Sequence, residues 1–259
     1  MRFMSMTTSD GVCEQDFTLD GIPGVLWFPA GAAGPRPLVL LGHGGGGGHK
    51  KATGLLARSR RLVTGCGFAA AAIDMPGFGD RAKTEQDERF VAEIRARQAA
   101  GEPIGPLVAR HNAALAERAV SEWRSVLDAL QALDVVGPGG PVGYWGVSLG
   151  TRIGVPLAAA EPRITAAVLG LIGSDWLTGI AARITIPVAF VLQWDDEGHP
   201  RDSVMKLFDA LGSAEKTLHA NPGPHRGVPS FEIDSSIRFF TRHLAVRAPR
   251  AAPDTTGAG

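Results

Sequence analysis

The 259-residue chain is long enough to bury a large core, and a single domain of this size is ordinary for an α/β protein. Hydrophobic residues make up 44% of the chain and charged residues 20%, which excludes an intrinsically disordered protein. The 26 basic and 26 acidic residues balance, so no overall field attracts nucleic acid or an anionic membrane. We therefore expect neither of these among its partners.

The chain carries no apolar run of membrane-spanning length, and residues 1–11 lack the apolar core of a signal peptide. Cys13 and Cys66 are its only cysteines, too few for a disulfide framework. We expect two reduced thiols and a soluble protein in the cytoplasm. The sequence leaves the oligomeric state open, with a homo-oligomer among the options.

The first third of the chain is predicted to alternate between strands and a helix. Residues 1–10 are polar and are expected to be loose. Apolar runs bounded by turn residues then predict, in chain order, strands over Glu14–Leu19, Gly24–Pro29 and Pro37–Leu41, a helix over Lys50–Thr64 and a strand over Phe68–Ile73. Asp20-Gly21 provides a hairpin turn between the first two strands. The runs over Pro37–Leu41 and Phe68–Ile73 are continuously apolar, which is typical of strands buried on both faces.

Residues 80–111 interrupt this alternation. They are rich in charges of both signs, and Gly101-Glu102-Pro103 separates two helical pieces. Balanced charge of this kind indicates a solvated helical face. A short apolar face is offered by Ile104, Pro106, Leu107 and Val108. We expect the segment to be a short helical cap inserted over the sheet rather than a second domain.

The alternation resumes in the second half of the chain. The predicted elements are a helix over Asn112–Leu133, a strand over Pro141–Trp145, a helix over Thr151–Glu161, strands over Ile164–Ile172 and Ile186–Trp194, a helix over Asp202–Leu211, a strand over Lys216–His219 and a helix over Phe231–Leu244. This order predicts a mainly parallel central sheet with helices on both faces, forming one α/β domain over residues 1–244. Residues 245–259 are rich in Ala, Pro, Gly and Thr and are expected to form a flexible tail.

Ser148 is the candidate nucleophile. It lies in Gly146-Val147-Ser148-Leu149-Gly150, between a predicted strand and a predicted helix. A serine on such a sharp turn holds its hydroxyl clear of the sheet, and the flanking glycines remove side chains that would clash in the bend. The leading amides of the helix then face any negative charge that develops beside the serine.

A serine nucleophile needs a base, and the base needs an acid that orients it. His225 follows the last short strand on a loop and is the best base, with His219, inside that strand, as the competitor. Asp196 is the preferred acid and Asp195 the reserve, because both follow a late apolar run. Asp175, after the preceding strand, is a third option.

The glycine-rich segment Gly44–Gly48 follows another buried strand. A backbone so free of side chains can turn an amide toward an oxyanion, and we name the amides of Gly45 and Leu149 as the donors. A phosphate-binding loop would require Gly-Lys-Ser/Thr, which is missing. His43 is expected to be a hydrogen-bonded scaffold residue, and no Cys/His spacing predicts a metal site.

Taken together, these motifs resemble the α/β-hydrolase superfamily, nearest to serine esterases of the dienelactone-hydrolase-like branch. The resemblance spans roughly residues 38–244 and is carried by His43–Gly46, Asp74–Gly79, Gly146–Gly150, Asp195-Asp196 with Pro200, and Gly223–His225. It implies the chain order Ser148, Asp196, His225 for the triad. The acid of the family commonly lies in Gly-x-x-Asp-x-x-x-Pro. Gln193 replaces that glycine, and counting from it selects Asp196.

The resemblance implies a serine carboxyl-ester hydrolase that acts on a small-molecule ester or acyl substrate without a cofactor. Dienelactone hydrolases carry cysteine in the elbow, so Ser148 favours an esterase over that activity. Acyl-chain release or cyclisation by a thioesterase-like enzyme is one alternative. A non-hydrolytic binding or cyclase protein on the same fold is another. Met75, Phe78 and Trp176 fall on predicted loops near the site and are the candidate substrate-binding residues.

Overall fold

The computed structural model describes residues 1–245, so the flexible tail expected beyond Ala245 lies outside the described residues. The strands are β1 (Arg2–Ser9), β2 (Val12–Leu19), β3 (Ile22–Pro29), β4 (Leu38–Gly42), β5 (Ala69–Ile73), β6 (Val142–Gly146), β7 (Ile164–Gly170), β8 (Val188–Gln193) and β9 (Lys216–Asn221). The helices are α1 (Thr53–Cys66), α2 (Glu85–Ala99), α3 (Gly105–Gln131), α4 (Leu149–Ala160), α5 (Asp175–Ala181), α6 (Arg201–Ala210) and α7 (Phe231–Leu244).

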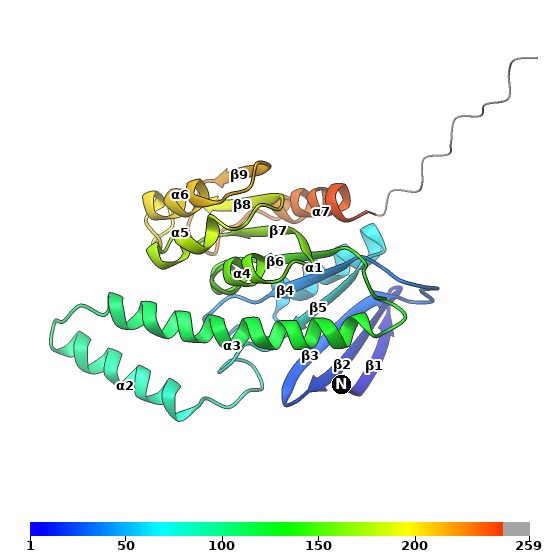
Figure 1. Cartoon of the computed structure of the whole chain (residues 1–259), viewed down its shortest axis with the longest axis horizontal. Coiled ribbons are helices and arrows are strands. Elements are labelled where there is room, and N and C mark those ends of the chain that lie inside the picture. Colours follow the sequence, from blue (N-terminus) through cyan, green and yellow to red (C-terminus); the bar gives the residue numbers. More distant parts are fainter. Residues whose placement is uncertain (246–259) are drawn as a thin grey trace, which may run out of the picture.

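All nine described strands form one sheet, in the order β1-β2-β3-β5-β4-β6-β7-β8-β9 (Figure 1). The pairs β1–β2, β2–β3 and β3–β5 are antiparallel, and every pair from β5 to β9 is parallel. The expected mainly parallel sheet is therefore confirmed. The carboxyl ends of its parallel strands meet at one edge, where open α/β sheets place their ligands.

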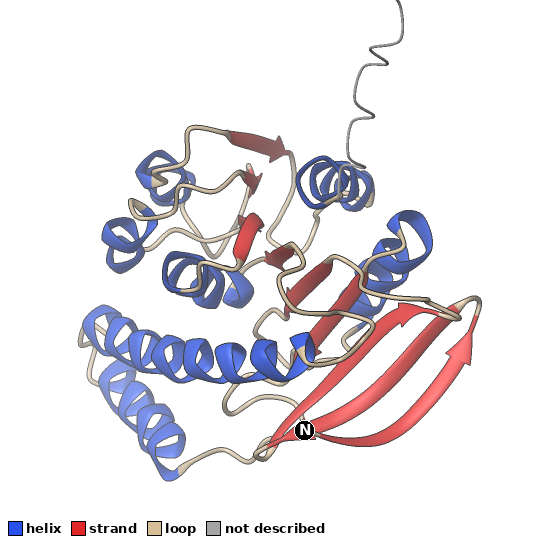
Figure 2. Cartoon of the chain, turned by 45° about the vertical axis from the view of Figure 1, so that its right-hand side comes forward, coloured by secondary structure: helices blue, strands red, loops and turns tan. Residues whose placement is uncertain are grey.

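Helices cover both faces of the parallel part of the sheet, as expected (Figure 2). Side chains of β4 show how the two layers are filled, since they alternate across the strand. Leu38 and Leu40 belong to the core cluster that includes α3, α4, α5 and α6. Val39 and Leu41 belong to the cluster that includes α1 and α7. The continuous apolar run of this strand is thus explained by burial on both faces.

Three elements differ from the sequence-based expectations. Residues expected to be loose form β1, an edge strand whose side chains are all exposed and which turns into β2 at Asp10-Gly11 with positive φ. Helix α5 was not predicted. Helix α3 begins at Gly105, so the expected boundary of the insertion at His111 lies inside a helix. Within residues 1–245, none of the helices has the length and hydropathy needed to cross a membrane.

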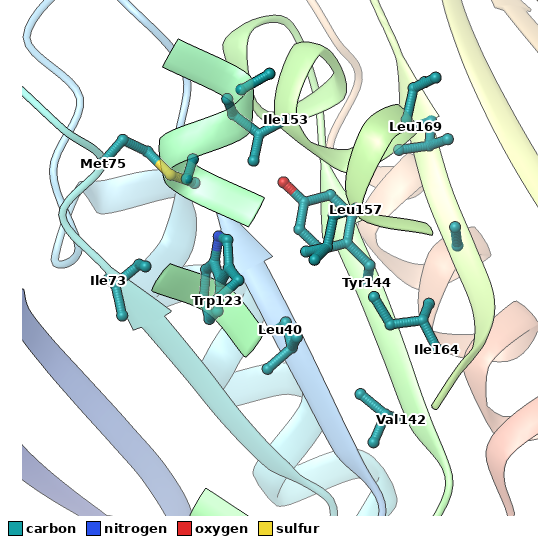
Figure 3. Packing of buried hydrophobic residues seen from close by; sticks show 14 of the residues in the cluster. Leu40, Ile73, Met75, Trp123, Val142, Tyr144, Ile153, Leu157, Ile164 and Leu169 are labelled. Carbon is teal, nitrogen blue, oxygen red and sulfur yellow. The ribbon is translucent and has the colours of Figure 1, made fainter. Parts of the chain in front are cut away.

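The core beneath α4 is built around two large aromatic side chains, Trp123 and Tyr144, which are both fully buried (Figure 3). The Tyr144 hydroxyl donates a hydrogen bond of 2.7 Å to the carbonyl of Gly150. Helix α4 approaches this ring so closely that a Cβ at Gly154 would overlap it and lie 2.8 Å from Leu169 Cδ2. Small residues on α4 therefore set its distance from the sheet.

Gly154→Ala is expected to lower the free energy of unfolding by about 1–3 kcal/mol, because the added methyl group forces Tyr144 or Leu169 from its position in a closely packed core. Urea denaturation monitored by circular dichroism measures this loss. Gly179→Ala in α5 is the matched control, since a Cβ there meets no atom within 4 Å. It should leave stability unchanged or raise it by up to about 1 kcal/mol. Equal stability of the two variants would contradict the packing explanation.

Candidate active site

Ser148 lies between β6 and α4 with φ 59° and ψ −117°, a left-handed conformation that is strained for a residue with a side chain. The neighbouring glycines make this turn sterically accessible. A Cβ at Gly146 would lie 2.7 Å from the Tyr144 hydroxyl, and a Cβ at Gly150 would lie 2.9 Å from the carbonyl oxygen of Gly42. The Gly-x-Ser-x-Gly pattern is thus required by the close contact between α4 and the strands.

The strained turn is fixed by hydrogen bonds to the next strand. The Ser148 amide donates to the Gly170 carbonyl at the end of β7, over 3.0 Å. The Thr151 hydroxyl accepts from the Gly170 amide at 2.7 Å and lies 2.9 Å from the Gly146 carbonyl oxygen. Buried bonds of this kind hold the serine backbone in place against its strain.

The side chains of Ser148, His225 and Asp196 form one hydrogen-bonded chain. His225 Nε2 lies 3.1 Å from Ser148 Oγ, and His225 Nδ1 lies 2.6 Å from Asp196 Oδ2. The histidine comes from the loop between β9 and α7, and the aspartate from the loop after β8. The three residues are thus brought together in the arrangement by which a base activates a serine and an acid orients the base.

Asp196 is ionised although its side chain is only 2% exposed. Burial by itself would raise its pKa. Hydrogen bonds from His225 and from the amides of Gly198 and His199 outweigh that effect and hold the pKa of Asp196 below its ordinary value. The carboxylate therefore remains charged at neutral pH and can accept a hydrogen bond from the Nδ1–H of the imidazole.

Two further carboxylates in the loop after β8 accept hydrogen bonds from backbone amides of the loop that carries His225, and not from its imidazole. Asp195 Oδ2 accepts a hydrogen bond of 2.9 Å from the Gly223 amide, and Glu197 Oε2 accepts one of 2.9 Å from the His225 amide. Gln193 Nε2 donates to the carbonyls of this loop at Pro222 and Pro224. These roles of Glu197 and Gln193 could not be predicted, since nothing in a sequence shows which backbone groups a loop side chain contacts.

The remaining candidates lie away from the triad. Asp175 is exposed on α5 and pairs with Lys206 of α6 at 2.7 Å. The Nδ1 atom of His219 lies 2.8 Å from Glu232 Oε2, which links β9 to α7. Neither residue contacts Ser148 or His225 in the described part of the chain.

The two residues expected to bind an oxyanion, Gly45 and Leu149, lie close together. Leu149 is the first residue of α4, so its amide has no acceptor within the helix. A Cβ on Gly45 would lie 3.9 Å from the Leu149 Cβ, which places the glycine loop directly over the start of the helix. Both residues line a cavity that also includes Ser148.

His43 fastens the glycine loop, as expected of a scaffold residue. Its side chain is fully buried, and its Nε2 accepts a hydrogen bond of 3.1 Å from the Met75 amide. Nδ1 therefore carries the proton and donates to the Gly44 carbonyl at 2.8 Å. Burial lowers the pKa of His43, in keeping with this neutral tautomer.

The buried carboxylate of Asp74, for which no role was predicted, supports the loop that follows β5. Asp74 is fully buried at the end of β5 and accepts hydrogen bonds from the amide and ammonium of Lys50 and from the Asp80 amide. A Cβ at Gly79 would overlap this carboxylate, so that position requires glycine. Arg81 then binds Glu122 of α3 through both guanidinium nitrogens, at 2.6 and 2.8 Å.

Two cavities meet at Ser148. The loop-side cavity has a volume of about 620 Å³ and is lined mainly by Gly44–Gly48, Leu55, Arg58, Val147, Ser148, His225 and Arg226. The α2-side cavity has a volume of about 340 Å³ and is lined mainly by Gly45, Phe78, Lys83, Asp87, Phe90, Val91, His111, Ser148, Leu149 and Arg152. A larger hollow of about 670 Å³ lies beside β1 and β2 and does not include Ser148.

The expected substrate-binding residues fall in different places. Phe78 lines the α2-side cavity. The expectation that Met75 lines the pocket is wrong. Its side chain is fully buried in the core, because Met75 follows the end of β5 by only two residues and still packs beneath the sheet edge. Trp176 packs against the same core from α5 and belongs to neither of the two cavities at Ser148.

The insertion lines the α2-side cavity with a different face from the one expected. Asp87, Phe90 and Val91 of α2 and His111 of α3 line it, whereas Ile104, Leu107 and Val108 do not. Leu107 is instead buried on α3. No cluster of three or more metal-ligating side chains occurs within residues 1–245.

Comparisons with known proteins point to one superfamily. No protein-family model matches the chain, and no curated protein sequence matches it. A cold-adapted esterase from an Arctic intertidal metagenomic library, solved with bound PEG, is 34% identical with a TM-score of 0.74, and the match covers 94% of this chain and 100% of that one. Acetyl xylan esterase 1 from a Thermoanaerobacterium species is 15% identical with a TM-score of 0.67, and the match covers 95% of this chain and 88% of that one.

The second of these similarities concerns the fold, whereas the first extends over the whole length of a protein at an identity that indicates common descent. The sheet order, the serine turn between β6 and α4 and the chain order Ser148, Asp196, His225 agree with it. The chain belongs to the α/β-hydrolase superfamily, with esterases as its structural neighbours.

Proposed function

We propose that the protein is a serine hydrolase that cleaves carboxylic esters through an acyl-enzyme on Ser148. The observation that carries the proposal is the hydrogen-bonded chain from Ser148 through His225 to Asp196, with distances of 3.1 and 2.6 Å. Two amides beside the serine, at Gly45 and Leu149, add the stabilisation of negative charge that acyl transfer needs. The esterase neighbours of the chain support the same reaction class.

In this mechanism His225 Nε2 takes the proton of the Ser148 hydroxyl as the oxygen attacks the ester carbonyl. The resulting oxyanion receives hydrogen bonds from the amides of Gly45 and Leu149. Asp196 holds the imidazole in its tautomer and stabilises its positive charge. His225 then protonates the leaving alcohol, and the acyl group stays on Ser148. In the second half of the reaction His225 takes a proton from a water molecule as the water attacks the acyl carbonyl. It returns that proton to Ser148 Oγ as the acid leaves.

We further propose that α2 acts as the cap that limits the substrate. Phe90 and Val91 stand across the α2-side cavity from Ser148, and Phe90 stacks on His111 of α3 with ring centroids 3.6 Å apart. An acyl or alcohol chain entering this cavity meets their apolar surface. The length of that chain is thereby restricted on one side of the serine.

Ser148→Ala is expected to lower kcat for p-nitrophenyl butyrate by about a thousandfold or more, because the members of a triad act as a unit. The fold should persist, as judged by circular dichroism. Incubation with a p-nitrophenyl phosphonate should add one phosphonyl group to the wild-type protein and none to the variant, measured by mass spectrometry. Turnover by a folded Ser148→Ala protein at the wild-type rate would exclude the acyl-enzyme.

Asp196→Asn is expected to reduce kcat by about a thousandfold or more, because an amide in this position favours the wrong imidazole tautomer. Asp195→Asn is the matched control, since an Asn oxygen can still accept the Gly223 amide, and its kcat should stay within about tenfold of wild type. Steady-state kinetics on one p-nitrophenyl ester compares the two. The reverse ranking would move the acid to Asp195.

Phe90→Ala is expected to relax chain-length selectivity, because it removes an aromatic wall from the α2-side cavity. The ratio of kcat/KM for p-nitrophenyl octanoate to that for the acetate should rise about tenfold, which corresponds to the loss of a steric term of about 1.4 kcal/mol. Val108→Ala, on the same insertion but outside the cavity lining, is the control and should keep the wild-type ratio. If both variants keep it, α2 does not limit the substrate.

A further inference from the structure

Arg152 lies in the first turn of α4, four residues after the candidate nucleophile. Arg152 lines the α2-side cavity together with Ser148 and Leu149. Its charge also helps to lower the pKa of His199, after the larger effect of burial, and the His199 ring lies 5.5 Å from that of His225. The guanidinium therefore belongs to the surroundings of the triad.

The guanidinium of Arg152 has no protein partner in the described part of the chain. Its Nε atom is buried without a hydrogen-bond acceptor, and no carboxylate forms an ion pair with it. Burial accordingly lowers the pKa of Arg152. A partly buried cation without a counter-charge is unfavourable unless a ligand supplies the missing charge.

Two partly buried arginines elsewhere in the described chain are paired with carboxylates. Arg81 binds Glu122 through two nitrogens, and Arg163 binds Glu161. Arg58, at the loop-side cavity, lies 4.9 Å from the centre of the Trp145 ring. No hydrogen bond or ion pair satisfies Arg58 either, but its cation lies over this aromatic ring. Arg152 has neither a ring nor a polar partner among the described residues, although a guanidinium usually makes several such contacts.

The charges around the α2-side cavity do not neutralise Arg152. Lys83 and Asp87 also line it, and Asp87 already accepts hydrogen bonds from Thr84 and lies 3.5 Å from Arg118. Burial lowers the pKa of His111, the remaining titratable group of the lining, so that this imidazole is neutral at neutral pH. Asp87 is the single carboxylate of the lining and is already paired with Arg118, so the lining holds no free carboxylate for Arg152.

We propose that Arg152 binds a carboxylate carried by the substrate, so that the preferred esters are those with a free carboxylate a few bonds from the scissile carbonyl. The inference rests on the proposed ester hydrolysis and names its substrate class. The planar guanidinium matches a carboxylate through two parallel hydrogen bonds. A carboxylate supplies the counter-charge that Arg152 lacks. The volume of about 340 Å³ suits a short chain such as that of a succinate or glutarate half-ester.

The kinetic test compares charged and neutral esters of equal length. One pair is monoethyl glutarate and ethyl pentanoate, with the carboxylate on the acyl side. The other pair is 3-acetoxypropionate and propyl acetate, with the carboxylate on the alcohol side. Initial rates in a pH-stat give the ratio of kcat/KM for the charged ester to that for the neutral one. Arg152→Met should lower this ratio about 30-fold or more in one of the two pairs, since a buried charge pair is lost.

Two further variants separate charge from geometry. Arg152→Lys keeps a positive charge without the planar fork and should lower the ratio by an intermediate factor. Arg183→Met removes an exposed arginine after α5, outside the cavity lining, and should keep the wild-type ratio within about twofold. Wild-type ratios in both ester pairs for Arg152→Met, or an equal change in Arg183→Met, would overturn the proposal.

A binding measurement tests the carboxylate site independently of turnover. Isothermal titration calorimetry with N-ethylsuccinamate, an amide analogue of a half-ester, should show saturable binding to the wild-type protein. Binding should be lost in Arg152→Met, and the neutral N-ethylbutanamide should bind neither protein. If the wild-type protein cleaves no ester, the proposed function fails, while this titration still decides the role of Arg152. Equal binding of N-ethylsuccinamate by both proteins would exclude the carboxylate site. So would failure of the wild-type protein to bind either N-ethylsuccinamate or N-acetyl-β-alanine, the amide analogue of 3-acetoxypropionate.

Discussion

The close approach of α4 to the sheet is the constraint on which the site depends. Positions 42, 146 and 150 must be glycine because a Cβ at any of them would meet the Tyr144 hydroxyl or the backbone opposite. The Tyr144 hydroxyl then ties the helix to the strand through the Gly150 carbonyl. With the helix so near, the chain can leave β6 only by a sharp turn, and Ser148 adopts a positive φ. The strain serves function, since the same turn exposes both the hydroxyl and the first amide of the helix.

Most of the sheet and the positions of Ser148 and His225 could be predicted because they depend on local signals. Strands buried on both faces are continuous apolar runs, and the serine turn needs its glycines at fixed spacing. The edge strand β1 carries no such signal, because its side chains are exposed and it pairs with only one strand, β2. The start of α3 could not be predicted either, since its first turns follow a Gly-Glu-Pro segment that ordinarily separates helices.

The roles of the three consecutive acidic residues after β8 show where sequence reasoning stops. Asp195, Asp196 and Glu197 are chemically alike, and each accepts a hydrogen bond from the segment Gly223–His225. Only Asp196 reaches the imidazole, whereas its neighbours bind backbone amides. The course of the turn after β8 and the path of the histidine loop decide this, and both are tertiary properties. Met75 fails as a pocket residue for a similar reason, because the position at which its side chain leaves the core depends on the course of the loop after β5.

The three residues of the hydrogen-bonded chain are positioned by elements of the core, whereas α2, which lines the α2-side cavity, is less firmly held. Ser148, Asp196 and His225 follow strands or precede helices whose apolar side chains fill the core. Helix α2, by contrast, buries no side chain, and the contacts that hold it to α3 include the Asp87–Arg118 pair and the Phe90–His111 stack. Substitutions on α2 therefore have little core packing to disturb. The lining of the α2-side cavity can therefore change while the hydrogen-bonded chain from Ser148 to Asp196 stays in place.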